Sequence, residues 1–190
     1  MEKLKEQVFK ACEVLKAGGL ILYPTDTVWG IGCDATNADA VAKVYELKKS
    51  ADKKSMIVLI ENTDRVALSV DGAPSVAWDL IDMSDKPLTL ILEGAKGVAS
   101  NLVPEEGTLG VRVPNHEFCK RLLHRFMKPI VSTSANISGE ATPLKFTEIS
   151  KEIKNGVDMI IDTDMEGVMT RKPSSIISLG RGGEIKILRD

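Results

Sequence analysis

The sequence has few of the residues that mark several common classes of protein. Only three of its 190 residues are cysteine, and their odd number and wide spacing fit neither a disulfide framework nor a zinc site. No apolar run is long enough to cross a bilayer, and the charged first ten residues lack the apolar stretch of an export signal. We therefore expect reduced cysteines, no membrane association and a location in the cytoplasm.

The sequence also lacks a surplus of charge of one sign. Its formal net charge of −2 gives no general attraction for nucleic acid, so a basic site must come from local clustering. One such cluster is the lysine loop, which contains Lys48, Lys49, Lys53 and Lys54. Because 190 residues can bury a sizeable core and no repeat or linker is visible, we expect a single domain over residues 1–190.

Three familiar catalytic motifs are absent as well. The chain has no Gly-rich phosphate loop ending in Gly-Lys-Ser or Gly-Lys-Thr, no His-Glu-x-x-His and no serine nucleophile elbow. Residues 30–35 imitate a dinucleotide-binding fingerprint, but a polar turn separates them from the preceding strand and no helix pattern begins at their third small residue. These classes of enzyme are therefore not expected.

What the sequence does contain is an alternation of helical and strand patterns. Helices are expected at residues 8–15, 37–48, 75–81, 117–126 and 146–153. Strands are expected at residues 20–23, 56–60, 88–92, 109–113, 129–132 and 159–161. A closing hairpin of residues 176–179 and 185–188 favours a mixed sheet over a purely parallel one. The pattern predicts an α/β fold.

Two polar segments follow predicted strands. In the first, Thr25, Asp26 and Thr27 present two hydroxyls and a carboxylate, and Gly30 and Gly32 allow the backbone a close approach. Small polar groups at the carboxyl end of a strand are where open α/β sheets bind ligands. This segment is therefore a candidate wall of a binding site.

The second polar segment, residues 132–139, contains four hydroxyls and the amide of Asn136 but no charge. Hydroxyls and backbone N–H groups suit phosphate or carboxylate oxygens. The alternative is that these side chains only build turns and a helix cap.

Arg112 lies between two valines of a predicted strand, where a buried guanidinium needs an anionic partner. That partner is either a ligand or the carboxylate of a structural salt bridge. The lysine loop is either a solvated surface or, together with Arg112 and Arg189, a source of cations for a polyphosphate. The residues thus favour binding of an anionic ligand without a covalent nucleophile.

Several longer motifs occur in a fixed order along the chain. They are Tyr-Pro-Thr-Asp-Thr-Val-Trp-Gly-Ile-Gly at 23–32, the lysine loop before Met-Ile-Val-Leu at 56–59, Pro-Leu-Thr-Leu at 87–90, Gly-Thr-Leu-Gly-Val-Arg-Val-Pro at 107–114, Ser-Thr-Ser-Ala-Asn-Ile-Ser-Gly at 132–139, Pro-Ser-Ser-Ile at 173–176 and Ile-Leu-Arg at 187–189. In this ordered set the chain resembles the YrdC/Sua5/TsaC family of L-threonylcarbamoyladenylate synthases, in its short single-domain form.

The resemblance implies a twisted, open mixed sheet flanked by helices, with a basic concave face. It also implies a nucleotidyltransferase reaction in which L-threonine, bicarbonate and ATP give threonylcarbamoyl-AMP and pyrophosphate. The product would supply the threonylcarbamoyl group of N6-threonylcarbamoyladenosine at position 37 of tRNA, through a downstream tRNA threonylcarbamoyl-transfer complex. Binding of tRNA or double-stranded RNA would be a further possibility.

The same resemblance assigns residues to the two substrates. Threonine or its carbamate would be contacted by Thr27, Arg112, Ser132 and Ser174. ATP or the adenylate would be held by Lys48, Ser50, Lys54, Thr108, Ser134, Asn136, Thr142 and Arg189. Charge would be stabilised by Arg112 and Lys54, with no protein nucleophile and no protein metal site, and Mg²⁺ would be carried by the phosphates.

The chain departs from the family pattern at two places. Ser50 stands where the lysine loop of the family has an arginine, and Lys49 or Lys53 could replace its charge but not its bidentate geometry. Residues 84–86 are Ser-Asp-Lys where the family has Trp-Pro-Gly. Both changes bear on the affinity for ATP.

Two other functions are compatible with some of these features. A non-catalytic RNA-binding or ribosome-associated module would use the basic concave face, although the weakly acidic net charge argues against it. A carbamoyl-transfer domain of the hydrogenase-maturation type would need accessory domains that this sequence does not contain.

Overall fold

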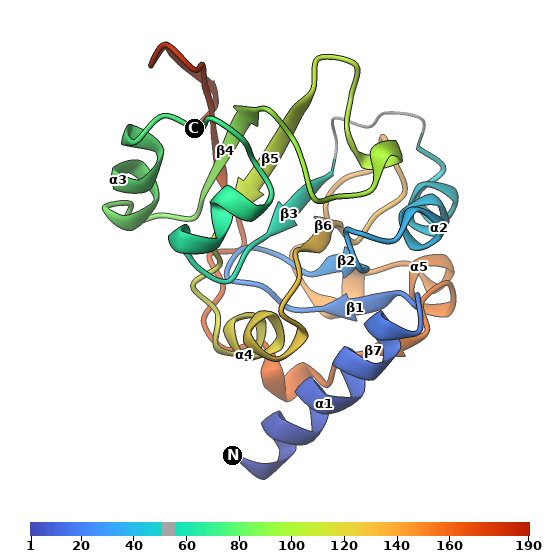
Figure 1. Ribbon diagram of the computed structural model, residues 1–190. Helices are drawn as coiled ribbons and strands as arrows, with labels where there is room; N and C mark the ends of the chain where they lie inside the picture. The colour runs from blue at the N-terminus through green and yellow to red at the C-terminus, as the bar shows by residue number, and fades with distance from the viewer. Residues whose placement is uncertain (51–55) are drawn as a thin grey trace.

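The computed structural model describes residues 1–50 and 56–190, and its helices and strands alternate along the chain (Figure 1). The α-helices are α1 (Glu2–Lys16), α2 (Ala38–Lys48), α3 (Val76–Asp82), α4 (Glu117–Phe126) and α5 (Lys151–Asn155). The strands are β1 (Ile21–Tyr23), β2 (Gly30–Gly32), β3 (Ile57–Leu59), β4 (Leu88–Glu93), β5 (Thr108–Arg112), β6 (Ile130–Ser134), β7 (Met159–Ile160), β8 (Ser175–Leu179) and β9 (Ile185–Arg189). Short 3₁₀ helices are η2 (Thr63–Leu68), η3 (Ser100–Leu102), η4 (Phe146–Glu148) and η5 (Thr163–Met165).

The ends of the helices follow from local sequence. The chain turns back after α1 at Gly18, whose φ of 75° is in the left-handed region that glycine adopts without strain. Helix α2 begins at Asn37, whose side-chain oxygen accepts hydrogen bonds from the backbone N–H groups of Asp39 and Ala40. Gly18 thus fixes where α1 ends, and Asn37 fixes where α2 begins.

Nine strands of the described residues form one sheet in the order β7-β1-β2-β6-β3-β5-β4-β8-β9. The pairs β1–β7, β3–β5 and β4–β8 are parallel, and the other neighbours are antiparallel. The predictions of an α/β fold, a mixed sheet and a closing β8–β9 hairpin are therefore confirmed.

The structure differs from the sequence-based expectation in three places. Strand β2 was not expected, because two of its three residues are glycine, which has a low preference for strands. Strand β6 continues through Ser134, so the first three residues of the predicted 132–139 loop pair with neighbouring strands. The predicted helix at 146–153 is instead η4 followed by α5, because Ile149 and Ser150 have extended backbones between them.

Alternate residues of the strands point to opposite faces of the sheet, and the two faces are covered differently. One face carries the larger core, with Leu22, Val58, Leu90, Val111 and Val131 fully or almost fully buried. On the other face, α1 and α4 pack side by side over β1 and its neighbours (Figure 1).

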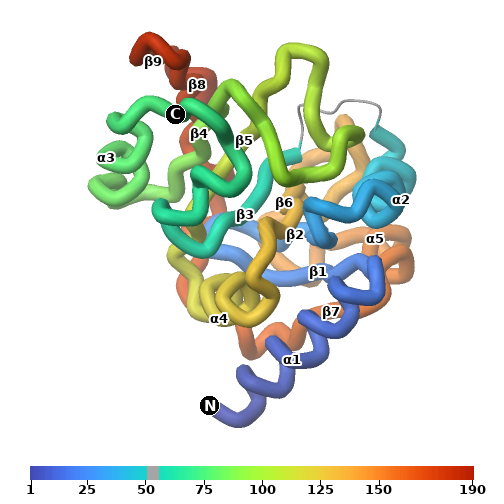
Figure 2. The backbone as a smooth tube through the Cα atoms, viewed as in Figure 1, coloured from blue at the N-terminus to red at the C-terminus, as the bar shows by residue number. Residues whose placement is uncertain are grey.

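The second face is covered only in part. Helices α1 and α4 bury Tyr23, Leu59 and Ile130, whereas the same face of β4, β5 and β8 is left for a cavity. The N-terminus lies at the far end of α1, away from the β8–β9 hairpin (Figure 2). No helix among the described residues is both long and apolar enough to cross a membrane.

Gly32 provides a test of how closely this sheet is packed. A Cβ atom at Gly32 would lie 2.7 Å from Tyr23 Cε1 and 2.9 Å from the carbonyl oxygen of Val131. A Cβ atom at Gly30 would come no closer than 3.3 Å to any neighbour. Gly32→Ala is therefore expected to lower the free energy of unfolding by about 1–3 kcal/mol, and Gly30→Ala by clearly less.

Urea unfolding of both variants measures this difference. An equal loss would contradict the assignment of Gly32 to core packing. Of the two glycines, Gly30 lines the cavity described below and Gly32 does not. A smaller loss of stability for Gly30→Ala would agree with this difference in surroundings.

Candidate functional site

A cavity of about 320 Å³ opens on the uncovered part of the sheet. Its wall comes from the turn between β1 and β2, from β3, β4, β5, β6 and β8, and from the end of β9. Both polar segments singled out in the sequence reach it, as does Arg112. The structure therefore brings together groups that lie more than one hundred residues apart in the chain.

The turn between β1 and β2 is built by its own hydroxyls. Thr25 Oγ1 donates to the carbonyl oxygen of Val28 over 2.8 Å, so its single proton is used there. Thr27 Oγ1, 2.8 Å from Thr25 Oγ1, must therefore donate in that pair. Arg112 Nη1 in turn donates to Thr27 Oγ1 over 3.1 Å. The result is a directed chain of hydrogen bonds that orients Thr27 toward the arginine.

Arg112 forms a buried ion pair with Asp26. Nη2 lies 2.9 Å from Oδ1 of Asp26, and both side chains are at least 93% buried. Oδ2 of the same carboxylate accepts a hydrogen bond from the backbone N–H of Asn115 over 3.0 Å. The structural salt bridge considered from the sequence is thus present, and Asp26 is the acid that forms it.

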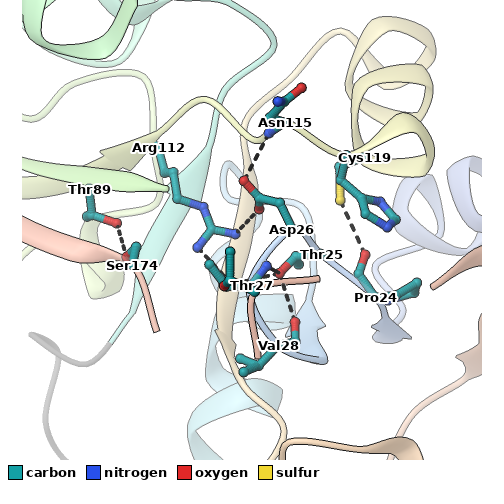
Figure 3. Close-up of polar contacts among 12 residues, drawn as sticks. Pro24, Thr25, Asp26, Thr27, Val28, Thr89, Arg112, Asn115, Cys119 and Ser174 are labelled. Carbon is teal, nitrogen blue, oxygen red and sulfur yellow. Dashed lines mark hydrogen bonds and ion pairs between the residues drawn. The ribbon is translucent and has the colours of Figure 1, made fainter. Parts of the chain in front are cut away.

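The ion pair does not use all of the donors of Arg112. Its Nε is buried and has no hydrogen-bond partner among the described residues. Figure 3 shows the guanidinium between the Asp26–Thr27 turn and the Thr89–Ser174 pair. Because an unpaired buried N–H is costly, this position favours an oxygen acceptor close to Nε.

Ser132 and Ser134 lie two residues apart in β6, so both face the cavity. They lie beside Gly30 of β2, which pairs with Ser134 and has no side chain to cover them. Thr142, from the loop after β6, also lines the cavity. Here the sequence-based expectation of a hydroxyl-lined site agrees with the placement of the side chains.

The opposite wall is formed by Ser174 and Arg189. Ser174 Oγ lies 2.7 Å from Thr89 Oγ1, and the Ser174 carbonyl oxygen accepts from Arg189 Nε over 2.8 Å. Burial, and then the nearby charge of Arg112, lower the pKa of Arg189 below its usual value. Two guanidinium groups that repel each other across one cavity make that cavity favourable for an anion.

Thr108 does not line this cavity but an adjoining one of about 330 Å³. The two cavities share Ile91 and Ile176, and the second is lined largely by apolar side chains such as Met56 and Leu102. Together they offer a polar compartment beside an apolar one.

Three of the predicted ATP ligands lie outside both cavities. Lys48 is almost fully buried, and its Nζ donates to the carbonyl oxygens of Ser134 and Asn136 over 2.7 Å each. Asn136 donates from its side chain to the carbonyls of Ile137 and Glu140. Lys48 and Asn136 thus hold the backbone at and after the end of β6. Ser50, whose backbone N–H donates to the carbonyl oxygen of Tyr45, also lines neither cavity. Lys53 and Lys54 lie outside the described residues.

The sequence did not reveal several residues that shape the site. Thr89 pairs with Ser174, and Trp29 of the 23–32 motif is fully buried at the cavity wall. Glu166 accepts a hydrogen bond from Trp29 Nε1 over 2.8 Å. Thr89 could have been found from its position in Pro-Leu-Thr-Leu, whereas nothing in the sequence around Glu166 indicates its contact.

Comparison with known proteins places this site in a family. The family model Sua5_yciO_yrdC, described as telomere recombination, matches residues 13–190. The chain belongs to this family. It is 33% identical over 169 residues to a threonylcarbamoyl-AMP synthase of Pseudoalteromonas translucida, covering 87% of this chain and 89% of that protein.

Two further members of the family support the comparison. A threonylcarbamoyl-AMP synthase of Coxiella burnetii is 31% identical over 179 residues, covering 93% of this chain and 94% of that protein. The crystal structure of P. abyssi Sua5 complexed with L-threonine superposes with a TM-score of 0.82 at 28% identity, over 90% of this chain. This chain spans half the length of that protein.

Because Arg112 belongs to a buried ion pair, its loss should lower the free energy of unfolding more than the loss of an exposed arginine. Arg112→Ala leaves the Asp26 carboxylate buried without its counter-charge, which should lower the free energy of unfolding by about 3–5 kcal/mol. Arg121→Ala removes an exposed arginine that pairs with Glu117 and should cost about 0–1 kcal/mol. Urea unfolding compares the two variants, and similar losses would show that the Arg112–Asp26 pair is energetically equivalent to a surface pair.

Lys48 predicts a dependence of stability on pH. Burial lowers the pKa of its ammonium group from 10.5 to about 8, so between these two values the unfolded chain binds a proton that the folded chain has lost. The contribution of Lys48 to stability should therefore rise as pH increases from about 8 to 10.5.

Urea unfolding of the native protein and Lys48→Met over this pH range tests the point. The stability difference between them should shift in favour of the native protein as pH rises. A pH-independent difference would show that Lys48 keeps an ordinary pKa in the fold.

Proposed function

We propose that this protein is a threonylcarbamoyl-AMP synthase that acts in N6-threonylcarbamoyladenosine synthesis on tRNA. The observation that carries the proposal is the cavity in which Arg112, Arg189 and the hydroxyl of Ser132 converge. The names of the curated relatives, and the L-threonine in the P. abyssi structure, support threonine as the substrate. The RNA-binding alternative is not favoured, because these relatives are named as enzymes.

The proposed chemistry needs no nucleophile from the protein. The amine of threonine combines with bicarbonate to give a carbamate and water. A carbamate oxygen then attacks the α-phosphorus of ATP, and the bond to the β-phosphate oxygen breaks, so that threonylcarbamoyl-AMP forms and pyrophosphate leaves. The protein must therefore align the carbamate with the α-phosphate of ATP and stabilise the negative charge of both with positively charged and hydrogen-bonding groups.

We assign the threonine side of the reaction to the polar cavity. The guanidinium of Arg112 would meet the carboxylate or carbamate, and Thr27, Ser132 and Ser174 would surround the remaining polar atoms. Thr27 already donates its proton to Thr25, so it would meet the substrate as an acceptor. Bicarbonate would enter the same compartment.

We assign ATP to the other end of the polar cavity and to its apolar neighbour. Ser134, Thr142 and Arg189 would contact phosphates, and Thr108 would contact the nucleoside in the apolar compartment. Lys48, Ser50 and Asn136 would support this pocket from behind β6. Lys54 would be a further phosphate contact.

Mg²⁺ would arrive with the phosphates of ATP as part of the substrate. Among residues 1–50 and 56–190, no three His, Cys, Asp or Glu side chains gather in a way that could hold a metal ion. The hydroxyls and guanidinium groups of the cavity fit the phosphate end of a metal–nucleotide complex better than a bare cation.

The proposal also covers the location of the protein, its domain organisation and the use of its product. We place the protein in the cytoplasm as a single domain over residues 1–190, which is compatible with its three buried, unpaired cysteines. Its product is a reactive mixed anhydride, so an enzyme that transfers the threonylcarbamoyl group to tRNA must act next. Direct contact of this protein with tRNA would be made while its product passes to that enzyme.

A pyrophosphate-release assay tests the proposed function. Purified protein with ATP, bicarbonate and Mg²⁺ should release pyrophosphate only when L-threonine is added. Arg112→Lys keeps a positive charge but loses the planar fork, so we expect at least a tenfold lower kcat/KM for threonine. The exposed Arg121→Lys should retain the native rate.

Two outcomes would contradict the proposal. Pyrophosphate release that does not depend on threonine would exclude this reaction. Tight RNA binding that weakens steeply with salt, in a protein whose thermal stability responds to neither ATP nor threonine, would favour the RNA-binding alternative.

A further inference from the structure

Residues 166–174, which we call the strap, cross the outside of the turn that forms one wall of the cavity. The backbone N–H of Thr170 donates to the carbonyl oxygen of Asp26, and that of Arg171 donates to the carbonyl oxygen of Thr27, each over 2.9 Å. The strap ends at Ser174, which lines the opposite wall. One segment therefore connects both walls of the threonine compartment.

The first residue of the strap, Glu166, is held from two directions. Its Oε1 accepts a hydrogen bond from Nε1 of Trp29, and its carbonyl oxygen accepts one from Nε2 of His116, each over 2.8 Å. Trp29 is fully buried, and His116 is 5% exposed at the start of α4. Glu166 thus fastens the strap both to the cavity wall and to the start of α4.

The protonation of His116 agrees with this arrangement. Because Nε2 donates to a carbonyl oxygen, Nδ1 of the neutral ring carries no proton, and Nδ1 is buried without a partner in the part of the chain that the structure describes. Burial lowers the pKa of His116, which favours this neutral form. The contact to Glu166 therefore does not depend on a charged histidine.

The strap is held in a conformation that an unrestrained chain would leave. Arg171 has a φ of 53°, which is unfavourable for a residue with a Cβ atom, and Gly167 has a φ of 56°. Such a conformation persists only where surrounding contacts fix it. Contacts that fix it are those of Glu166 at one end, the two backbone hydrogen bonds in the middle, and those of Ser174 with Thr89 and Arg189 at the other end.

We infer that Glu166 is a positioning residue for threonine. Its bond to Trp29 holds the strap against Thr27 and thereby fixes the spacing between the Thr27 wall and the Ser174 wall. The identity of the ligand in this inference rests on the proposed function, whereas the fastening of the strap does not. The ATP contacts assigned to Ser134 and Thr108 come from β6 and β5 and not from the strap, so they should be insensitive to Glu166.

Hydrogen exchange of the ligand-free protein tests the fastening. Glu166→Ala removes the acceptor, and Trp29→Phe removes the donor while keeping an aromatic ring. Both variants should exchange the amides of Thr170 and Arg171 at least tenfold faster than the native protein. Glu166→Gln keeps an acceptor oxygen and should exchange at the native rate.

Asp164→Ala is the matched control, because Asp164 lies two residues before Glu166 and its side chain pairs with the exposed Lys3 near the start of α1. Its exchange rates should be native. Unchanged protection of the two amides in both Glu166→Ala and Trp29→Phe would overturn the inference, whatever reaction the protein catalyses.

Steady-state kinetics test the link to threonine. Glu166→Ala and Trp29→Phe should each raise the KM for threonine about fivefold to tenfold, with kcat and the KM for ATP within twofold of native values. Because the two residues share one hydrogen bond, the double variant should be little worse than either single variant. Glu166→Gln should restore the native KM.

A different pattern would reject the positioning role. If the KM values for both substrates rise together with a lower melting temperature, Glu166 serves only stability. If kcat falls while both KM values stay native, Glu166 acts in the chemical step. If the native protein shows no threonine-dependent turnover, the proposed function fails, and the hydrogen-exchange result still decides whether Glu166 fastens the strap.

Discussion

The ion pair between Arg112 and Asp26 is the interaction on which the rest of the site depends. It joins the end of β5 to the turn between β1 and β2, two elements that are separated in the sheet by β2, β6 and β3. A buried guanidinium without a counter-charge would be strongly unfavourable, so the turn has to lie where its carboxylate meets Arg112. Once it does, Thr27 is oriented, and one donor of the arginine has no partner within residues 1–50 and 56–190.

The two-residue repeat of the strands explains how one sheet serves as both core and binding surface. In β5 the side chains of Leu109 and Val111 point into the larger core, whereas Arg112 reaches the cavity. In β6, Val131 belongs to the core, and Ser132 and Ser134 face the cavity. Because the strands are rigid elements of the fold, the hydroxyls are held without a cost of ordering when a ligand binds.

The helix layer decides which part of the sheet can bind. Helices α1 and α4 occupy the second face over β1 and β3, and their apolar side chains fill that space with Leu15, Phe118 and Leu122. Farther along the sheet none of the described helices takes this position, and the uncovered parts of β4, β5 and β8 supply the cavity. The strap and the loop after β6 then close its sides. The site is thus the part of an ordinary layered fold that the helices leave open.

Much of this architecture could be predicted from the sequence, because periodicity and capping act over a few residues. Helix α4 begins and ends where its apolar spacing indicates, and Asn37 caps α2 as its residue type favours. The hydroxyls of Ser132 and Ser134 could be identified as site candidates from composition alone. Their location in a strand could not, because it depends on pairing with β2 and β3, which lie far away in sequence.

By itself the sequence determined the α/β alternation, the mixed sheet indicated by the closing hairpin, and the set of hydroxyls and cations from which an anion site could be built. Only the tertiary structure decided that Asp26 is the partner of Arg112, that Lys48 supports a backbone instead of lining the cavity, and that Glu166 meets Trp29. The physical reason is that local pattern depends on neighbouring residues, whereas the choice of a buried charge's partner depends on which distant segments the packed core brings within about 3 Å.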